Sequence, residues 1–247
     1  MHSLRCSPCF DQPLLDEHDA VLREGLAAIV NIHMSDTQWI QASTPVRNGG
    51  LGIRRAASLA LPAFLASAAA TSDLQCSILS RFQLSVDKEV ATARTHWRSL
   101  IDTPTPLGPL ESSRRAWDAT LLARDLRSVE EAASSPLDRA RLLTATAAHG
   151  SEWIFALPIT ACGLRLSNEA IRVAIGLRLG LSLCEPHPCP CGSVVDPRGL
   201  HGLSCKRSAG RSTRHQQLND VIWRAPTSRH SSNQGTVRTD FGLRPAS

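Results

Sequence analysis

Four side chains near the C-terminal end of the sequence have the types and the spacing of metal ligands. Cys189, Cys191, His201 and Cys205 form the pattern C-x-C-x9-H-x3-C. Thiolates and an imidazole at loop spacing can hold one tetrahedral zinc ion (Zn2+) without needing a large buried apolar core. We therefore predict a zinc site with these four residues as ligands.

The segment that carries these residues, 184–205, is unsuited to a regular helix or strand. Its 22 residues contain four of the eight cysteines and two of the nine histidines of the chain, together with four prolines and three glycines. A bound ion would supply the cohesion that the composition lacks. The glycines stand where a knuckle needs sharp turns, at Gly192, Gly199 and Gly202.

Two alternatives to this ligand set remain open. A single residue between Cys189 and Cys191 is a tighter spacing than the usual two to four, and Cys184 and His187 are close enough in sequence to serve as substitute ligands. The other alternative is a surface loop whose cysteines are incidental. The clustering of thiols and imidazoles favours the zinc site.

The chain must build its core from aliphatic side chains. Apolar residues make up 42% of the 247 residues, but aromatic residues only 4%, and tyrosine is absent. Leu and Ala favour helices, whereas sheets draw on aromatic and β-branched residues. We expect a mainly α fold: a helical bundle followed by a small zinc-knuckle loop region, one further helix and a disordered basic tail.

Composition divides the chain into four regions. The Pro-rich stretch 103–109 separates two helical regions, residues 1–102 and 110–183. The predicted knuckle occupies residues 184–206. A basic helix and tail occupy residues 207–247.

Local signals predict where several helices begin and end. Ser35, Ser135 and Ser167 are placed as N-caps, and Gly180 as a terminator. Pro62 should kink an alanine-rich helix that ends near residue 71, or start a new one.

The same patterns predict which apolar side chains are buried and where the protein resides. Leu74 and Ile78 should belong to a packed stripe, and residues 152–158 should form an apolar plug. No apolar run approaches the ~20 residues of a membrane span, and the N-terminus lacks the apolar stretch of a signal peptide. We expect an intracellular protein, nuclear or cytoplasmic, with no membrane association and with reduced cysteines.

The positive charge is concentrated at the C-terminal end. The net charge is +5, but the residues after Pro197 carry nine Lys and Arg against two acids, a balance of +7, which leaves −2 for the rest. Such a segment can bind the phosphates of RNA or DNA with little sequence preference, or it can be a solvated tail. The candidate nucleic-acid contacts are Arg198, Lys206, Arg207, Arg211, Arg214, His215 and Arg224.

Several stretches are similar to a known family. These are W-I-Q-A-S-T-P-V-R-N-G-G-L-G-I-R from Trp39, A-L-P-A-F-L-A-S from Ala60, and G-L-R-L-S-N-E-A-I-R-V-A-I-G-L-R-L-G, which precedes C-E-P-H-P-C-P-C-G and H-G-L-S-C. They resemble, in order, the region downstream of the reverse transcriptase domain in non-LTR (LINE-type) retrotransposon polyproteins. The resemblance implies a helical thumb and linker, then a Cys-Cys-His-Cys knuckle that contacts nucleic acid. The knuckle ligands of the family map onto Cys189, Cys191, His201 and Cys205.

The chain departs from the family where catalysis would take place. In one branch an Arg-His pair belongs to a restriction-like endonuclease, and Arg214-His215 resembles that pair. The Pro-Asp acid of such nucleases has no counterpart here, since only Asp220 and Asp240 follow Asp196, and no Asp-Asp pair occurs to bind the magnesium ions of a polymerase. The resemblance thus implies a fragment truncated before the nuclease acids.

Three functions are compatible with these observations. The first is a non-catalytic, retrotransposon-derived zinc protein that binds RNA or DNA through its basic segment. The second is a helical protein-interaction module whose zinc is purely structural. The third is a residual endonuclease that uses Arg214, His215, Asp220 and Asp240.

Overall fold

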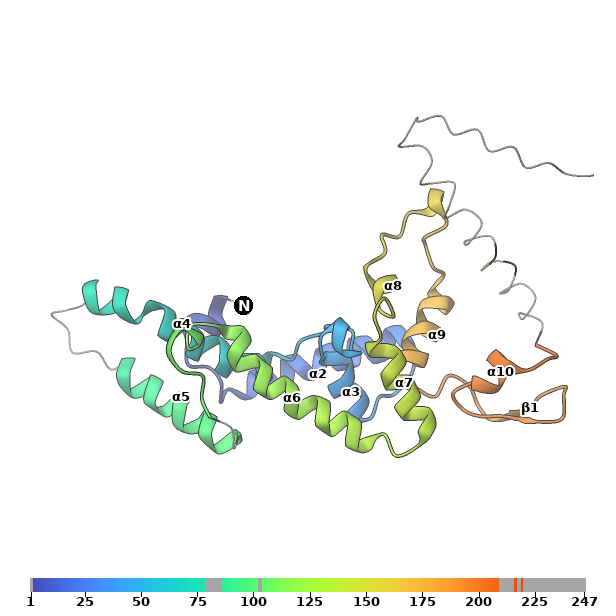
Figure 1. Ribbon diagram of the computed structural model, residues 1–247, viewed down its shortest axis with the longest axis horizontal. Coiled ribbons are helices and arrows are strands. Elements are labelled where there is room, and N and C mark those ends of the chain that lie inside the picture. The colour runs from blue at the N-terminus through green and yellow to red at the C-terminus, as the bar shows by residue number, and fades with distance from the viewer. Residues whose placement is uncertain (1, 79–85, 102–103, 209–215, 217–218, 220–247) are drawn as a thin grey trace, which may run out of the picture. The chain divides into compact units, whose positions relative to one another are not determined.

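The computed structural model describes residues 2–78, 86–101, 104–208, 216 and 219 (Figure 1). The described chain is mainly α-helical and contains a two-stranded antiparallel ribbon, so the predicted fold class is confirmed. It divides into two compact units, residues 1–183 and 184–247. Most of the predicted last helix and tail, and part of the predicted linker, lie outside the described residues.

The first of two apolar cores in the first unit is built around a pair of tryptophans. Trp97 and Trp117 are fully buried and meet edge to face, with ring centroids 5.0 Å apart. Such a pair adds about 0.5–1.5 kcal/mol beyond the burial of its area. Leu61 and Phe64 pack in the same core. The helices around it are α1 (His2–Cys6), α4 (Ala56–Ile78), α5 (Val86–Leu100) and α6 (Arg114–Ala132).

The second core joins helices from opposite ends of the first unit. Val30 and Trp39 pack against Leu179 and Leu181, all of them buried. The Arg172 side chain adds a polar tie, because its Nε donates to the Val30 carbonyl at 3.1 Å. The helices concerned are α2 (Pro13–Val30), α3 (Asp36–Ser43) and α9 (Asn168–Leu179).

The predicted helix caps are confirmed. The hydroxyls of Ser35, Ser135 and Ser167 each accept a hydrogen bond from the backbone N–H three residues later, and Gly180 ends α9 with a φ of 70°. The remaining elements of the first unit are α7 (Pro136–Thr146), α8 (Glu152–Phe155) and the 3-10 turns η1 (Val46–Asn48), η2 (Gly108–Leu110) and η3 (Thr160–Cys162).

A buried arginine fixes the glycine-rich turn against α9. Arg178 is 6% exposed, and its Nε donates to the Gly50 carbonyl at 3.0 Å. Its Nη2 donates to the Val46 carbonyl at 2.7 Å and to the Ser151 hydroxyl at 2.8 Å. Burial lowers the pKa of Arg178 from its usual value, so these acceptors must offset the lost hydration. The side-chain amide of Gln41 donates hydrogen bonds to the backbone carbonyls of Gly49 and Arg178.

Of the two outcomes predicted for Pro62, the start of a new helix is wrong, and so is the predicted end of the alanine-rich helix near residue 71. One helix, α4, runs from Ala56 through Pro62 to Ile78. A proline at this position removes a backbone hydrogen bond, at a cost of about 3 kcal/mol. The helix is retained because every residue of 59–66 is buried, and this packing offsets the loss.

Two predictions of burial are also wrong. Leu74 and Ile78, on the last turns of α4, are 60% and 69% exposed. Phe155 and Leu157, the centre of the expected apolar plug, are 71% and 68% exposed. Apolar periodicity shows which face of a helix is apolar, but it does not reveal whether another helix packs against that face.

The length and composition of α4 bear on the expectation about membrane spans. Its most apolar 18-residue window has a mean hydropathy of 1.2, so by these two measures α4 is long and apolar enough to cross a bilayer. In the structure 44% of that window is buried, through the packing of residues 59–66 in the first unit. A core helix meets the same two criteria.

The hydrogen bonds of Arg178 predict a large loss of stability when its guanidinium group is removed. Arg178→Met leaves the carbonyls of Val46 and Gly50 without these donors, and we expect the free energy of unfolding to fall by at least about 2 kcal/mol. Urea denaturation followed by circular dichroism measures the change. The exposed Arg165 provides the control, since Arg165→Met should change stability by under about 0.5 kcal/mol. Equal effects of the two substitutions would contradict the assigned hydrogen bonds.

Candidate metal centre

A tight turn in the second unit holds the first two thiols. Strands β1 (His187–Pro188) and β2 (Val194–Val195) pair antiparallel. The Cys189 N–H donates to the Ser193 carbonyl, and the Gly192 N–H donates to the Cys189 carbonyl, each at 2.8 Å. Gly192 has a φ of 90°, which a residue with a Cβ rarely adopts. The turn thereby carries Cys189 and Cys191 close together.

A short helix, α10 (Leu200–Ser204), supplies the other two side chains. His201 lies in it, and Cys205 follows its last residue with its N–H donating to the His201 carbonyl at 2.9 Å. Asp196 orients the start of this helix, because its carboxylate accepts from the N–H groups of Arg198 at 3.1 Å and Leu200 at 3.0 Å. A spacing of four residues then brings the imidazole and the thiol to one side.

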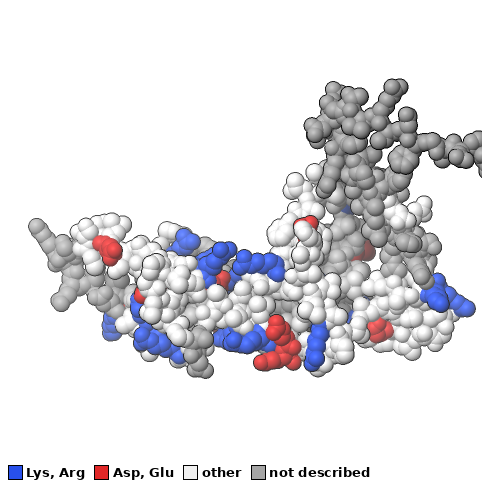
Figure 2. Space-filling model, in the orientation of Figure 1, with Lys and Arg blue, Asp and Glu red and all other residues white. Residues whose placement is uncertain are grey.

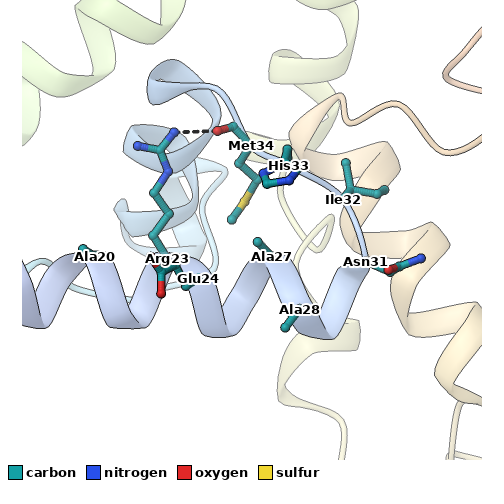
Figure 3. A pocket seen from close by; sticks show the side chains of 9 residues that line it. All are labelled: Ala20, Arg23, Glu24, Ala27, Ala28, Asn31, Ile32, His33 and Met34. Carbon is teal, nitrogen blue, oxygen red and sulfur yellow. Dashed lines mark hydrogen bonds between the residues drawn. The ribbon is translucent and has the colours of Figure 1, made fainter.

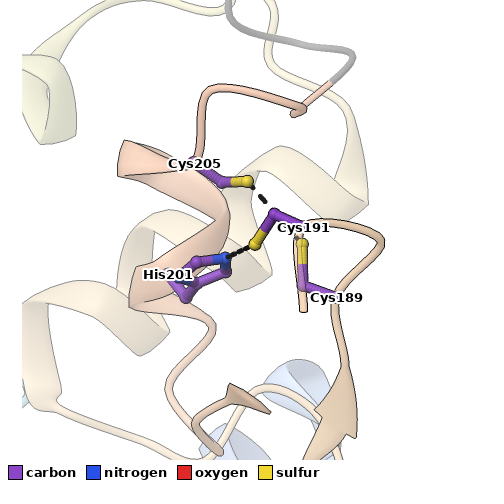
Figure 4. Close-up of side chains that lie close together, drawn as sticks. All are labelled: Cys189, Cys191, His201 and Cys205. Atoms are coloured by element: carbon purple, nitrogen blue, oxygen red, sulfur yellow. Dashed lines mark hydrogen bonds between the residues drawn. The ribbon is translucent and has the colours of Figure 1, made fainter. Parts of the chain in front are cut away.

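The four predicted ligands converge (Figure 4). Their donor atoms all lie within 4.8 Å of one another. The Sγ atoms of Cys189 and Cys205 are 3.6 Å apart, and the Cys191 Sγ lies 3.1 Å from the His201 Nε2. Atoms bound tetrahedrally to zinc at about 2.0–2.3 Å lie about 3.5–3.8 Å from one another. Shifts of about 1 Å or less would therefore complete such a site.

The chemistry of the donors suits a metal ion of borderline softness. Three thiols and one imidazole form a set that zinc prefers and that calcium and magnesium avoid. The Cys205 side chain is buried, Cys189 is half-buried and Cys191 is exposed. The backbone N–H of Arg207 donates to the Cys205 Sγ at 3.4 Å, which is the kind of outer contact that orients a thiolate ligand.

Hydrogen bonding separates the pKa values of the two thiols in the turn. The backbone N–H and then the hydroxyl of Ser193 lower the pKa of Cys191 to about 6. For Cys189 the Cys191 N–H acts in the lowering direction, but desolvation and the neighbouring thiols of Cys191 and Cys205 outweigh it and raise its pKa. Cys191 is therefore the thiol prepared to bind a cation at neutral pH.

The two substitute ligands lie outside the cluster. The Cys184 thiol donates to the carbonyls of Asp196 at 3.4 Å and Pro197 at 3.6 Å. His187 is exposed, with its Nδ1 2.9 Å from the Glu185 carbonyl. Cys184 thus fastens the base of the ribbon, and neither residue belongs to the group of converging donors.

Three of the predicted nucleic-acid contacts can be placed. Lys206 and Arg207 are exposed, and Arg198 is half-buried. Figure 2 shows basic side chains gathered on the second unit where α10 ends. Arg207 also braces the knuckle, because its Nη1 donates to the Pro190 carbonyl at 2.7 Å. The others lie outside the described residues, as do two acids named for a nuclease: Arg211, Arg214, His215, Arg224, Asp220 and Asp240.

Sequence reasoning missed the residues that position the ligands. Asp196 was not singled out, although Asp-Pro-x-Gly is a turn signature in which the aspartate accepts backbone N–H groups. Ser193 and the contact of Arg207 with Pro190 carry no comparable local signal. The contact of Arg207 with Pro190 depends on how the ribbon and α10 fold together, whereas Ser193 contacts Cys191 within the β1–β2 turn.

A hollow in the first unit, lined by described residues, offers no similar group of donors. It lies beside α2, has a volume of about 700 Å³ and is lined mainly by small or aliphatic side chains (Figure 3). Arg23 crosses it, donating to the Met34 carbonyl at 2.5 Å and to Asp36 at 2.7 Å. Among the described residues, the Cys/His cluster is the place where the donor atoms of three or more potential metal ligands converge.

No protein-family model, curated protein or solved structure matches this chain. The resemblance to retrotransposon polyproteins therefore stays a prediction from the sequence. What can be inferred about function rests on the Cys/His cluster and on the basic residues beside it.

The separated pKa values predict a difference in thiol reactivity. In protein stripped of metal with a chelator, the alkylation rate of Cys191 by iodoacetamide should be half-maximal near pH 6, where its thiolate forms, while Cys189 should react more slowly at pH 7. Tandem mass spectrometry of tryptic peptides resolves the two sites. Saturating zinc should protect both thiols. Equal rates at pH 7 would show that the turn does not keep the Ser193 hydrogen bonds to Cys191 without the metal.

Proposed function

We propose that the second unit is a zinc knuckle and that the basic residues next to it bind the phosphates of RNA or DNA. The convergence of Cys189, Cys191, His201 and Cys205 is the observation that carries the proposal. The need for an ion supports it as well. Among the described residues of this unit, the buried apolar side chains are Val195 and Cys205, too few for a self-sufficient core.

The zinc ion in this proposal is structural. Four protein ligands fill a tetrahedral shell, whereas a catalytic zinc keeps one position open for water or substrate. The thiolates and the imidazole would tie the β1–β2 turn to α10. The ion would thus supply folding free energy to the unit, and the chain would use it without chemical turnover.

The nucleic-acid part of the proposal rests on basic side chains that form no ion pair with a described carboxylate. In the first unit Arg54 pairs with Asp118, and Arg94 pairs with Glu111. No carboxylate in the described part of the chain forms an ion pair with Lys206 or Arg207. These cations belong to the segment after Pro197, which carries a net charge of +7. Basic segments of this kind bind phosphate backbones with little regard to sequence.

This proposal extends to origin and location. A protein derived from the region downstream of the reverse transcriptase domain in a LINE-type polyprotein, working in the nucleus or the cytoplasm, would bind nucleic acid through this basic segment. The quoted sequence resemblance supports this origin.

A second candidate function is a protein-interaction module whose zinc is only structural. A groove of about 530 Å³ between α6 and α7 favours it, with Leu126, Val129 and Leu142 along its walls. Leu143, also in its lining, is 71% exposed. Exposed apolar surface of this kind is typical of contact sites for other proteins.

The ligand assignment predicts the metal content of the protein. The purified full chain should contain one zinc per molecule, measured by elemental mass spectrometry and native mass spectrometry. Cys191→Ser should weaken zinc affinity by more than about 100-fold, because it removes a thiolate that binds the ion. Cys184→Ser is the matched control and should retain full zinc. Loss of zinc in Cys184→Ser with retention in Cys191→Ser would contradict the assignment.

The basic segment predicts how binding to nucleic acid depends on salt. Affinity for single-stranded RNA or duplex DNA should fall steeply between about 50 and 200 mM salt, measured by fluorescence anisotropy. Replacing Lys206 and Arg207 by glutamine should lower the slope of log K against log salt by about 1 for each phosphate that the protein no longer neutralises. Arg165→Gln, in the first unit, should leave the slope unchanged. Absent or salt-independent binding would favour the interaction module instead.

A further inference from the structure

Two of the four converging side chains are also arranged to react with each other. The Sγ atoms of Cys189 and Cys205 lie 3.6 Å apart. A disulfide bond is about 2.05 Å long, so a further approach of about 1.5 Å joins them. The two residues come from different elements, since Cys189 follows β1 and Cys205 follows α10.

We propose that Cys189 and Cys205 form an oxidisable pair whose disulfide expels the zinc ion and takes over its role as cross-link. The proposal rests on the zinc site of the proposed function and adds a modification to it. The oxidant is a peroxide. Reduction by a dithiol reverses the step and restores the site.

The chemistry of this step is balanced with one peroxide per disulfide. One thiolate attacks a peroxide oxygen, the O–O bond breaks, and a sulfenic acid and hydroxide form. The second thiolate attacks the sulfenic sulfur, the S–S bond forms, and a second hydroxide leaves. Two thiolates are oxidised by two electrons, hydrogen peroxide is reduced, and two protons from solvent convert the hydroxides to water. The zinc ion departs as a divalent cation.

The geometry favours this pair over the other thiols of the unit. Cys191 faces His201, with 3.1 Å between its Sγ and the Nε2. A bond between Cys189 and Cys191 would close a ring over a single intervening residue and tie no two elements together. The Cys184 thiol is engaged with backbone carbonyls outside the cluster.

The disulfide would leave the unit folded but unable to bind zinc. The bond between Cys189 and Cys205 closes a loop that contains β2 and α10, so it would restrict the unfolded chain as the ion would. Cys191 and His201 remain, and two ligands are too few to hold a structural zinc ion. Oxidation would therefore keep the unit cross-linked while removing its ability to bind zinc.

The test uses the zinc-loaded full chain treated with a small excess of hydrogen peroxide. Released zinc is followed with a chromogenic chelator, and disulfides are mapped by tryptic digestion without reduction. Trypsin cuts after Arg178, Arg198 and Lys206, which places Cys189 and Cys205 on separate peptides, 179–198 and 199–206. We expect one zinc released for each linked peptide pair, with tandem mass spectrometry locating the bond at Cys189, and full reversal by dithiothreitol.

Two variants match each other as controls, because each lacks one ligand of the proposed site. Cys191→Ser should still form the linked peptides on oxidation, whereas Cys189→Ser should lose the bond to residue 189. The wild-type peptide map decides the question even where a variant fails to fold. Bonding of Cys205 to Cys191 or Cys184 in the wild type, or zinc release without linked peptides, would overturn the redox proposal alone. Absence of bound zinc before oxidation would overturn the proposed function and this inference together.

Discussion

The second unit depends on the gathering of four ligand atoms around one point. Its ribbon has two-residue strands, α10 has five residues, and its described part buries very little apolar surface. Backbone hydrogen bonds and the Asp196 carboxylate shape the two turns, but a neutral bond contributes only about 0.5–1.5 kcal/mol and a bond to a carboxylate about 1.5–3 kcal/mol. A metal–thiolate bond set is the interaction strong enough to hold the turns together.

The first unit has a different physical basis. It contains two apolar cores, one around Trp97 and Trp117 and one around Val30 and Leu179. Between its helices, Arg178 is buried with its donors directed at backbone carbonyls of the glycine-rich turn. None of these contacts involves a residue of the metal site. Removal of metal should therefore affect the second unit and leave the cores of the first intact.

The features that were predicted correctly from the sequence depend on residues close together in the chain. The wrong predictions concern features that depend on contacts between distant parts of the chain. Helix starts at Ser35, Ser135 and Ser167 were predicted correctly because a cap acts within one turn, and the four converging Cys and His side chains could be picked out because their spacing is local. The continuity of α4 through Pro62 depends on helices far away in the chain. The same applies to the exposure of Phe155, since periodicity does not specify a packing partner.

The proposed zinc site would link the fold of the second unit to its proposed binding of nucleic acid and to its proposed response to peroxide. X-ray absorption at the zinc K edge of the zinc-loaded full chain tests it most directly. We predict a shell of three sulfurs at about 2.3 Å and one imidazole nitrogen at about 2.0 Å from the zinc, supplied by Cys189, Cys191, Cys205 and His201. A shell of oxygen and nitrogen alone, or of four sulfurs with no imidazole, would contradict the assignment of the site.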